Sequence, residues 1–262
     1  MMLFPDTREA LNSFTPIGLN EMDQVSFMNR TDLKFVLSAG RVTDLLTSLD
    51  RGYKILEINN ERLYSYCTTY LDTSDFMFFN QHLTGKLERN KVRFRKYEST
   101  GMTFLEVKRT TNKNRTIKWR IENKLSSDSL CDNKATEFIS MYVPQVSLFL
   151  KPVLISRFKR ATFIGSDMKE RVTIDYDLCF ADTKGNNIEM PSIAIVELKK
   201  DRINYSSLMA KRLKEMSVRS TGFSKYCVGA SLLYNPPRTN LIKSKLLLIK
   251  KIENEYSSHI SV

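Results

Sequence analysis

Lys91-Val92-Arg93-Phe94-Arg95 is the stretch that decides the fold. Successive side chains of a β-strand point to opposite faces, so the basic residues share one face while Val92 and Phe94 share the other. One face of the strand is charged, and the other is apolar and suited to burial in a core. The pattern therefore predicts a strand that separates an apolar core from a positively charged surface or interior.

The same alternation of charged and apolar residues recurs along the chain. It is found in residues 30–35, 105–108, 117–120, 157–159, 171–176 and 194–199. One interpretation is a half-exposed antiparallel sheet with a solvated face. The other is a closed barrel, with apolar residues packed outward against helices and charged residues inside a wet lumen. Large apolar partners such as Trp119 (expected on the outer core) and the scarcity of acidic residues favour the barrel, because a solvated face usually mixes both signs.

Other segments have helical spacing. They are residues 38–49, where Ser38 is a candidate cap, and residues 134–143 and 205–216. The basic segment 241–252 predicts a docked or solvated terminal helix, with contact to a membrane surface as the alternative. We expect one α+β domain over residues 1–262, with a core of about 27–234 and a basic tail or helix over 235–262.

The charge and composition of the chain exclude several classes of function. The chain has 41 Lys and Arg against 29 Asp and Glu, a net charge of +12, which indicates a polyanionic partner. No RNP-like motif supports nucleic acid. His82 and His259 lie at opposite ends and no cysteines form C-x-x-C, which argues against zinc sites and redox dithiols. No apolar run approaches the ~20 residues of a membrane span, so we expect a cytoplasmic protein without a transmembrane segment.

A series of motifs resembles one family. The motifs are Arg30-x-Asp32-x-Lys34-Phe35, Thr69-Tyr70-Leu71-Asp72-Thr73, Lys91-Val-Arg93-Phe-Arg95-Lys96-Tyr97, Phe104-Leu-Glu106-Val-Lys108, Lys118-x-Arg120, Arg157 with Arg160, Arg171-Val-Thr-Ile-Asp175, Val196-Glu197-Leu198-Lys199 and Phe223-Ser224-Lys225-Tyr226. In this order, from about residue 27 to 234, the chain resembles the VTC domain of polyphosphate polymerases, a branch of the triphosphate tunnel metalloenzymes.

The resemblance implies a closed, eight-stranded antiparallel β-tunnel with a basic lumen, flanked by helices. It implies transfer of the γ-phosphate of ATP to a growing inorganic polyphosphate chain, with Mn²⁺ or Mg²⁺. The implied phosphate-binding residues are Lys34, Arg93, Arg95, Lys108, Lys118, Arg157, Arg171, Lys199 and Lys225; Arg93, Arg95, Lys199 and Lys225 would bind the nucleotide phosphates, and Glu197 would be the metal ligand. An acceptor phosphate oxygen is already ionised, so this reaction needs no histidine base, and arginine and lysine suffice to neutralise charge.

Two departures refine the resemblance. Tunnel hydrolases tend to begin with Glu-x-Glu-x-Lys, whereas this chain has Arg30-Thr31-Asp32-Leu33-Lys34, which fits the polymerase branch better. The eukaryotic relatives carry a phosphate-sensing module and membrane helices, which this chain has no room for, so it resembles the stand-alone bacterial form. A tunnel-fold inorganic triphosphatase and a non-catalytic polyphosphate or nucleotide sensor are the alternatives.

Several residues also have simpler interpretations. Glu197 could pair with a basic neighbour in the barrel wall. We expect Glu106 and Asp175 to be counter-charges that orient basic residues, and Asp72 to cap or form a turn. His82 is expected to be an ordinary helix or loop histidine, with phosphate contact as the alternative.

Overall fold

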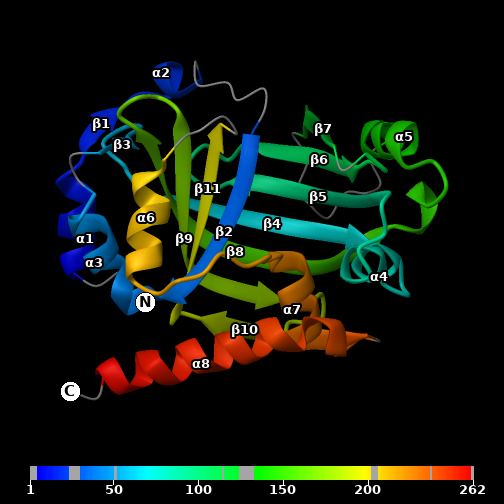
Figure 1. The fold of residues 1–262 in the computed structure, drawn as a ribbon. Coiled ribbons are helices and arrows are strands. Elements are labelled where there is room, and N and C mark those ends of the chain that lie inside the picture. The colour runs from blue at the N-terminus through cyan, green and yellow to red at the C-terminus, as the bar shows by residue number, and fades with distance from the viewer. Residues whose placement is uncertain are drawn as a thin grey trace.

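The alternating segments form strands of one sheet (Figure 1). The computed structural model describes residues 5–23, 30–49, 52–113, 115–123, 133–201, 206–236 and 238–260. The main path of the sheet, in spatial order, is β2 (Arg30–Ser38), β11 (Ile193–Asp201), β9 (Glu170–Ala181), β8 (Lys151–Gly165), β4 (Tyr64–Asp72), β5 (Arg89–Tyr97), β6 (Thr103–Thr110) and β7 (Thr116–Glu122), each antiparallel to its neighbours. Short strands β1 (Thr15–Ile17), β3 (Tyr53–Leu56) and β10 (Asn187–Met190) extend it. Every segment predicted from the alternation is therefore confirmed as a strand.

Helices lie on both faces and at one end of this sheet. They are α1 (Pro5–Asn12), α2 (Leu19–Asp23), α3 (Val42–Thr47), α4 (Met77–Leu83), α5 (Asn133–Tyr142), α6 (Leu208–Glu215), α7 (Lys225–Tyr234) and α8 (Lys243–Ile260), with 3₁₀ turns at Ala39–Arg41, Ser147–Phe149 and Thr239–Ile242. The α+β class with flanking helices is confirmed. Across the described residues, every helix is too short or too polar to span a bilayer.

The predicted helices are present with adjusted ends. Ser38 precedes the 3₁₀ turn that leads into α3, but its side chain forms no capping hydrogen bond. The helix expected from residue 205 begins at Leu208, because Ser207 caps it by accepting a hydrogen bond from the Ala210 amide at 3.0 Å; Tyr205 lies outside the described residues. The terminal helix α8 is docked through its buried Ile249 and Ile252.

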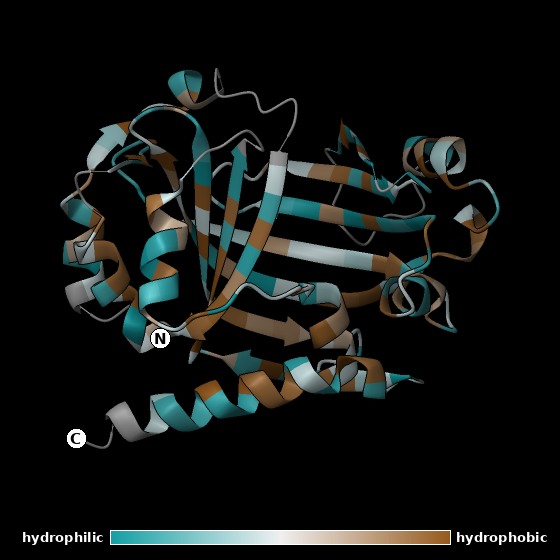
Figure 2. Ribbon diagram, viewed as in Figure 1, coloured by the Kyte–Doolittle hydropathy of each residue, from teal (hydrophilic) through white to brown (hydrophobic). Residues whose placement is uncertain are grey.

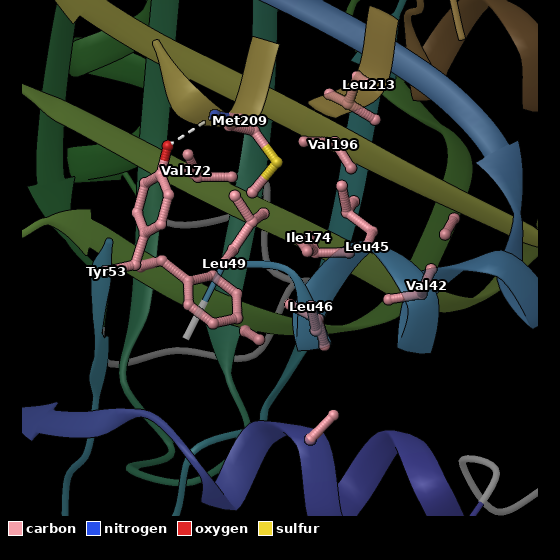
Figure 3. Packing of buried hydrophobic residues seen from close by; sticks show 14 of the residues in the cluster. Val42, Leu45, Leu46, Leu49, Tyr53, Val172, Ile174, Val196, Met209 and Leu213 are labelled. Carbon is pink, nitrogen blue, oxygen red and sulfur yellow. Dashed lines mark hydrogen bonds between the residues drawn. The ribbon is translucent and has the colours of Figure 1, made fainter. Parts of the chain in front are cut away.

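The main core lies between α1, α3, α6 and the outer face of β2, β9 and β11. Figure 3 shows Val172, Ile174 and Val196 of the sheet against Leu45 of α3 and Leu213 of α6. These side chains are buried. On β9 and β11 they alternate with the charged residues, which produces the bands of opposite hydropathy along the strands in Figure 2.

A second core lies beneath α5. Phe94 of β5 and Val107 of β6 pack there with Phe138 of α5. The Trp119 ring stacks on Tyr142 with 4.2 Å between ring centroids, which confirms that Trp119 faces the outer core. Phe94, Val107 and Trp119 therefore point away from the basic residues of their strands.

Helix α7 packs on β8 and β9 together with buried side chains such as Phe180 and Leu154. A Cβ on Gly229 would lie 2.6 Å from the Phe180 ring and 2.9 Å from Leu154, so only glycine permits this close approach. This packing holds α7 with its first residue, Lys225, beside the charged part of the sheet.

The strand pairing of the sheet does not close into a barrel within the described residues. Its end strands are β2 and β7, and within the described ranges no strand pairing joins them. Antiparallel pairing of the eight strands is confirmed, whereas closure into a tunnel stays a prediction. Lys34 of β2 and Lys118 of β7 nevertheless line the same cavity, so the sheet curls enough to bring both ends around one space.

Candidate functional site

A cavity of about 130 Å³, here called the inner cavity, is surrounded by basic side chains. Its lining consists of Lys34, Tyr70, Lys91, Arg93, Arg95, Lys108, Lys118, Phe158, Arg160, Asp175, Ile195, Glu197, Lys199, Phe223, Ser224 and Lys225. These residues come from β2, β4, β5, β6, β7, β8, β9 and β11 and from the start of α7. The alternation of each strand turns its basic members toward this cavity.

The structure brings the predicted site residues together with two exceptions. Lys34, Arg93, Arg95, Lys108, Lys118, Lys199, Lys225 and Glu197 line the inner cavity, and Arg157 and Arg171 do not. Arg171 is half-buried on β9, opposite Lys199 in register but beyond the lining. The side chain of Arg30, first of the motif residues, lies outside the described residues.

Arg157 is exposed, and Arg160 takes the position in the cavity. Residues three apart in a strand face opposite sides, so only one of these arginines can point inward. Arg157 pairs across the sheet with Cys67 and Cys179, and Phe158 shares the inner face with Arg160. The alternation in residues 157–159 predicts the opposite, because it puts the apolar Phe158 on the outer face, so the sequence holds no signal that would have identified Arg160.

Arg93 and Glu106 form an ion pair beside the cavity. The Glu106 Oε2 atom lies 2.7 Å from Nε of Arg93 and 2.6 Å from its terminal nitrogen. Burial opposes ionisation of Glu106, but Arg93 and Arg95 outweigh it and lower its pKa to about 2. Glu106 is thus confirmed as a counter-charge that orients Arg93.

Asp175 is likewise a counter-charge, and it orients two cations. Its oxygens lie 2.6 and 2.9 Å from Nε and NH2 of Arg160, and it also accepts a hydrogen bond from Lys225. Although Asp175 is buried, Arg160 and Lys225 lower its pKa to about 2. Lys225 lies 4.3 Å from the centroid of the Phe158 ring, a cation–π contact. Asp175 is confirmed as a counter-charge.

Glu197 differs from these two carboxylates. It forms an ion pair with Lys199, with 3.4 Å between Oε1 and Nζ, and no ion pair with an arginine in the parts of the chain that the structure describes. Burial opposes its charge, but Lys199, Lys34 and Arg160 hold its pKa well below the ordinary range. Glu197 therefore projects an ionised carboxylate into the cavity with its oxygens less engaged than those of Asp175.

The cations of the cavity outnumber its carboxylates. Burial and the cations Lys34 and Arg93 lower the pKa of Lys108 to about 8. Arg95 has no ion pair within the described ranges, its Nε atom lacks a hydrogen-bond partner there, and its pKa is lowered by burial and by Arg93. Such excess charge is unfavourable in the empty protein and favours an anion in the cavity.

A second pocket of about 510 Å³, here called the outer pocket, adjoins the inner cavity. The two share Lys34, Lys91, Lys108, Phe223 and Ser224. The outer pocket also contains Asp32, Leu33, His82, Leu83, Ser220, Thr221, Gly222, Cys227, Leu241, Ile242 and Lys245. Lys91 was absent from the predicted site set, although its spacing from Arg93 already places it on the same face.

Asp72 has a structural role, as predicted. Its oxygens accept hydrogen bonds from the amides of Phe78 and Phe79, both at 2.9 Å, and from the hydroxyl of Tyr226. This arrangement caps the start of α4 and ties it to α7. Asp72 therefore helps to fix the helix that carries Lys225.

Comparison with known proteins identifies a family for this chain. Residues 29–234 match the VTC domain family. No curated protein matches the chain. A Bacillus halodurans protein described as a candidate adenylate cyclase has a similar structure, with 13% sequence identity, a TM-score of 0.50, and coverage of 79% of this chain and 100% of that one. This likeness concerns the fold alone.

Two further solved structures are similar. A Hippeastrum protein, described as a candidate adenylyl cyclase with a dominant triphosphatase activity, is 13% identical over 78% of this chain and 96% of that one, with a TM-score of 0.47. A candidate adenylate cyclase from Vibrio parahaemolyticus is 12% identical over 77% and 97% of the two chains, with a TM-score of 0.43.

Proposed function

The chain belongs to the VTC domain family and has the fold of the triphosphate tunnel superfamily, and from this premise we propose that it is a polyphosphate polymerase. It would transfer the γ-phosphate of ATP to the end of an inorganic polyphosphate chain held in the inner cavity. The observation that carries the proposal is the convergence of basic residues from both ends of the sheet on one small cavity. The closed tunnel is part of this proposal.

Phosphoryl transfer requires positioning and neutralisation of charge more than covalent help from the protein. Arg93 is held in place by Glu106 and Arg160 by Asp175, so their guanidinium groups are fixed before substrate arrives. Arginine forks suit the equatorial oxygens of the transferred group. A terminal phosphate is an ionised nucleophile, so the reaction needs no residue to remove a proton.

The residues present fit a divalent cation that arrives with the nucleotide. The structure holds no group of three or more His, Cys, Asp or Glu side chains arranged for a metal within its described residues. Mg²⁺ is commonly held by one or two carboxylates together with substrate phosphates. Glu197, the cavity carboxylate not bound by an arginine, would hold Mn²⁺ or Mg²⁺. The cation would neutralise the charge of the phosphate oxygens.

An assay of the purified protein with ATP and Mn²⁺ tests the proposal. We expect long polyphosphate on a gel, removable by an exopolyphosphatase. Arg95→Met should abolish it, while Lys96→Met should not, because Lys96 is exposed on the same strand and pairs with Glu98.

The same assay distinguishes the polymerase from the two alternative functions, a triphosphatase and a sensor. Release of orthophosphate without polyphosphate would replace the polymerase with a triphosphatase. Nucleotide binding without any product, and with affinity unchanged in Glu197→Ala, would instead identify a sensor. Either result would overturn the polymerase proposal.

A further inference from the structure

Lys91 lies where the inner cavity meets the outer pocket and lines both. Its Nζ atom is 3.2 Å from Nε2 of His82 on α4 and donates a hydrogen bond of 3.2 Å to Oγ of Ser224, the residue that caps α7. On the neighbouring strand it is paired directly with Lys108. Lys91 therefore connects β5 with two helices at the junction of the two spaces.

The charged groups around Lys91 are mostly cations. Arg93 lies two residues along β5, Lys108 faces it from β6 and Lys34 faces it from β2. Arg89 of β5 also acts on the adjoining His82. From α7 it meets Ser224 and the thiol of Cys227, whose pKa is raised by burial. No carboxylate forms an ion pair with Lys91 in the described part of the chain; Asp32 of β2 lines the outer pocket but is exposed.

Burial, with the nearby Lys108, Lys34 and Arg93, lowers the pKa of Lys91 to about 7. Burial and Lys91 lower the pKa of His82 to about 3, so the imidazole is neutral at physiological pH. A neutral imidazole nitrogen can either accept a hydrogen bond from an ammonium group or, in its other tautomer, donate one to an amine. His82 can therefore serve as a partner for both protonation states of Lys91.

We propose that Lys91 is a further phosphate-binding residue, and that it takes up a proton when a polyphosphate anion enters the inner cavity. This inference rests on the proposed function, because it requires the cavity to bind phosphate. The amine of Lys91 gains one proton from the solvent buffer and becomes an ammonium group. That ammonium donates to the anion, while His82 and Ser224 accept from it.

Binding coupled to proton uptake has a defined pH dependence. Below about pH 7 Lys91 is already charged in the empty protein, so no proton is taken up. Above that pH, the bound anion raises the pKa of Lys91 and binding must draw a proton from solution. Affinity therefore falls as pH rises, by up to about tenfold per pH unit from this residue alone.

Calorimetric titration with tripolyphosphate, without metal, measures the proton uptake. Titrations at pH 7 in two buffers of different ionisation enthalpy give the number of protons taken up per site. Lys91, half-charged at this pH when the site is empty, should contribute about 0.5 proton. Lys108, Lys118 and Lys225, with pKa values of about 8, are mostly charged at pH 7 and contribute less.

Three variants isolate the contribution of Lys91. Lys91→Met should lose about half a proton of uptake relative to the wild type. Lys91→Arg should lose the same uptake while it retains binding, because arginine stays charged in both states. Between pH 7.5 and 8.5 the affinity of Lys91→Arg should also fall less steeply than that of the wild type. Over this pH unit the wild type should lose about tenfold more affinity than the variant. The matched control Lys96→Met should behave as the wild type.

The outcomes separate the two proposals. If the wild type binds tripolyphosphate but its proton uptake is unchanged in both Lys91→Met and Lys91→Arg, the inference about Lys91 is wrong and the proposed function stands. If the wild type does not bind tripolyphosphate, both proposals fail. Loss of uptake in Lys91→Arg with binding retained supports the inference, because a purely structural role for Lys91 would not alter the proton count.

Discussion

The two faces of strand β5 show how the molecule divides its tasks. Phe94 is 1% exposed and packs with the apolar residues beneath α5. Its neighbour Arg95 points into the inner cavity, where no ion pair within the described residues balances its charge. Burial of Phe94 stabilises the fold, whereas Arg95 adds unbalanced charge. The comparison indicates that the outer face stabilises the fold, whereas the inner face lowers the stability of the folded protein and in return can bind an anion.

The largest expected effect comes from breaking the outer face. Phe94→Ala should lower the free energy of unfolding by about 3–5 kcal/mol, because it removes a buried ring and leaves a cavity. Urea unfolding of the ligand-free protein measures this. Ile117→Ala on β7, where the side chain is 42% exposed, is the control and should change stability by about 0.5 kcal/mol or less. Equal effects of the two substitutions would contradict the assignment of the core.

Substitution of two arginines on the inner face should change the stability of the empty protein in opposite directions. Arg93→Met leaves the part-buried Glu106 without its ion-pair partner and should lower the stability of the empty protein by about 1–3 kcal/mol. Arg95→Met removes a cation that forms no ion pair within the described residues and that Arg93 repels, and it should raise that stability by about 1 kcal/mol. Urea unfolding in a buffer free of phosphate compares them. A clear loss of stability in Arg95→Met would show that the cavity charge is balanced in the empty protein.

The stability of the empty protein should also rise with pH. The pKa values of Lys108 and Lys225 are lowered to about 8, against 10.5 for an ordinary lysine. Between these values the unfolded chain binds more protons than the folded protein, so the free energy of unfolding increases as pH rises from about 8 to 10. Urea unfolding at several pH values should show this rise, with a smaller slope in Lys108→Met. Constant or falling stability of the empty protein across this range would count against a crowded basic cavity.

The sequence predicts the strands well, and on β5 their two faces as well, because a period of two is a local property, whereas on β8 the predicted faces are reversed. Lys91, Arg93 and Arg95 show their common face without any knowledge of the partner strands. Arg157 is exposed and lies outside the lining of the inner cavity, where Phe158 and Arg160 share the inner face of β8, and its role in phosphate binding stays a prediction. Whether Arg171 contacts a ligand stays a prediction.

Long-range contacts could not be predicted. Ser224 contacts Lys91 across 133 residues of sequence and His82 across nine, and nothing in their local sequence indicates that the two meet there. The close approach of α7 to β9 depends on Gly229, which in the sequence is one glycine within an otherwise ordinary helix. These contacts follow from the packing of helices on a sheet that only the complete chain forms.

The central claim is that the inner cavity, rather than the overall charge of +12, binds the phosphate chain. Calorimetric affinity for tripolyphosphate, measured at the same salt concentration for two double variants, tests it most directly. Arg93→Met with Arg95→Met removes two cations at the cavity, and Lys250→Met with Lys251→Met removes two exposed cations of α8. We predict at least about a hundredfold loss of affinity in the cavity variant, since each charge-assisted contact contributes about 1.5–3 kcal/mol, and little change in the α8 variant. Equal losses in the two variants would contradict the account.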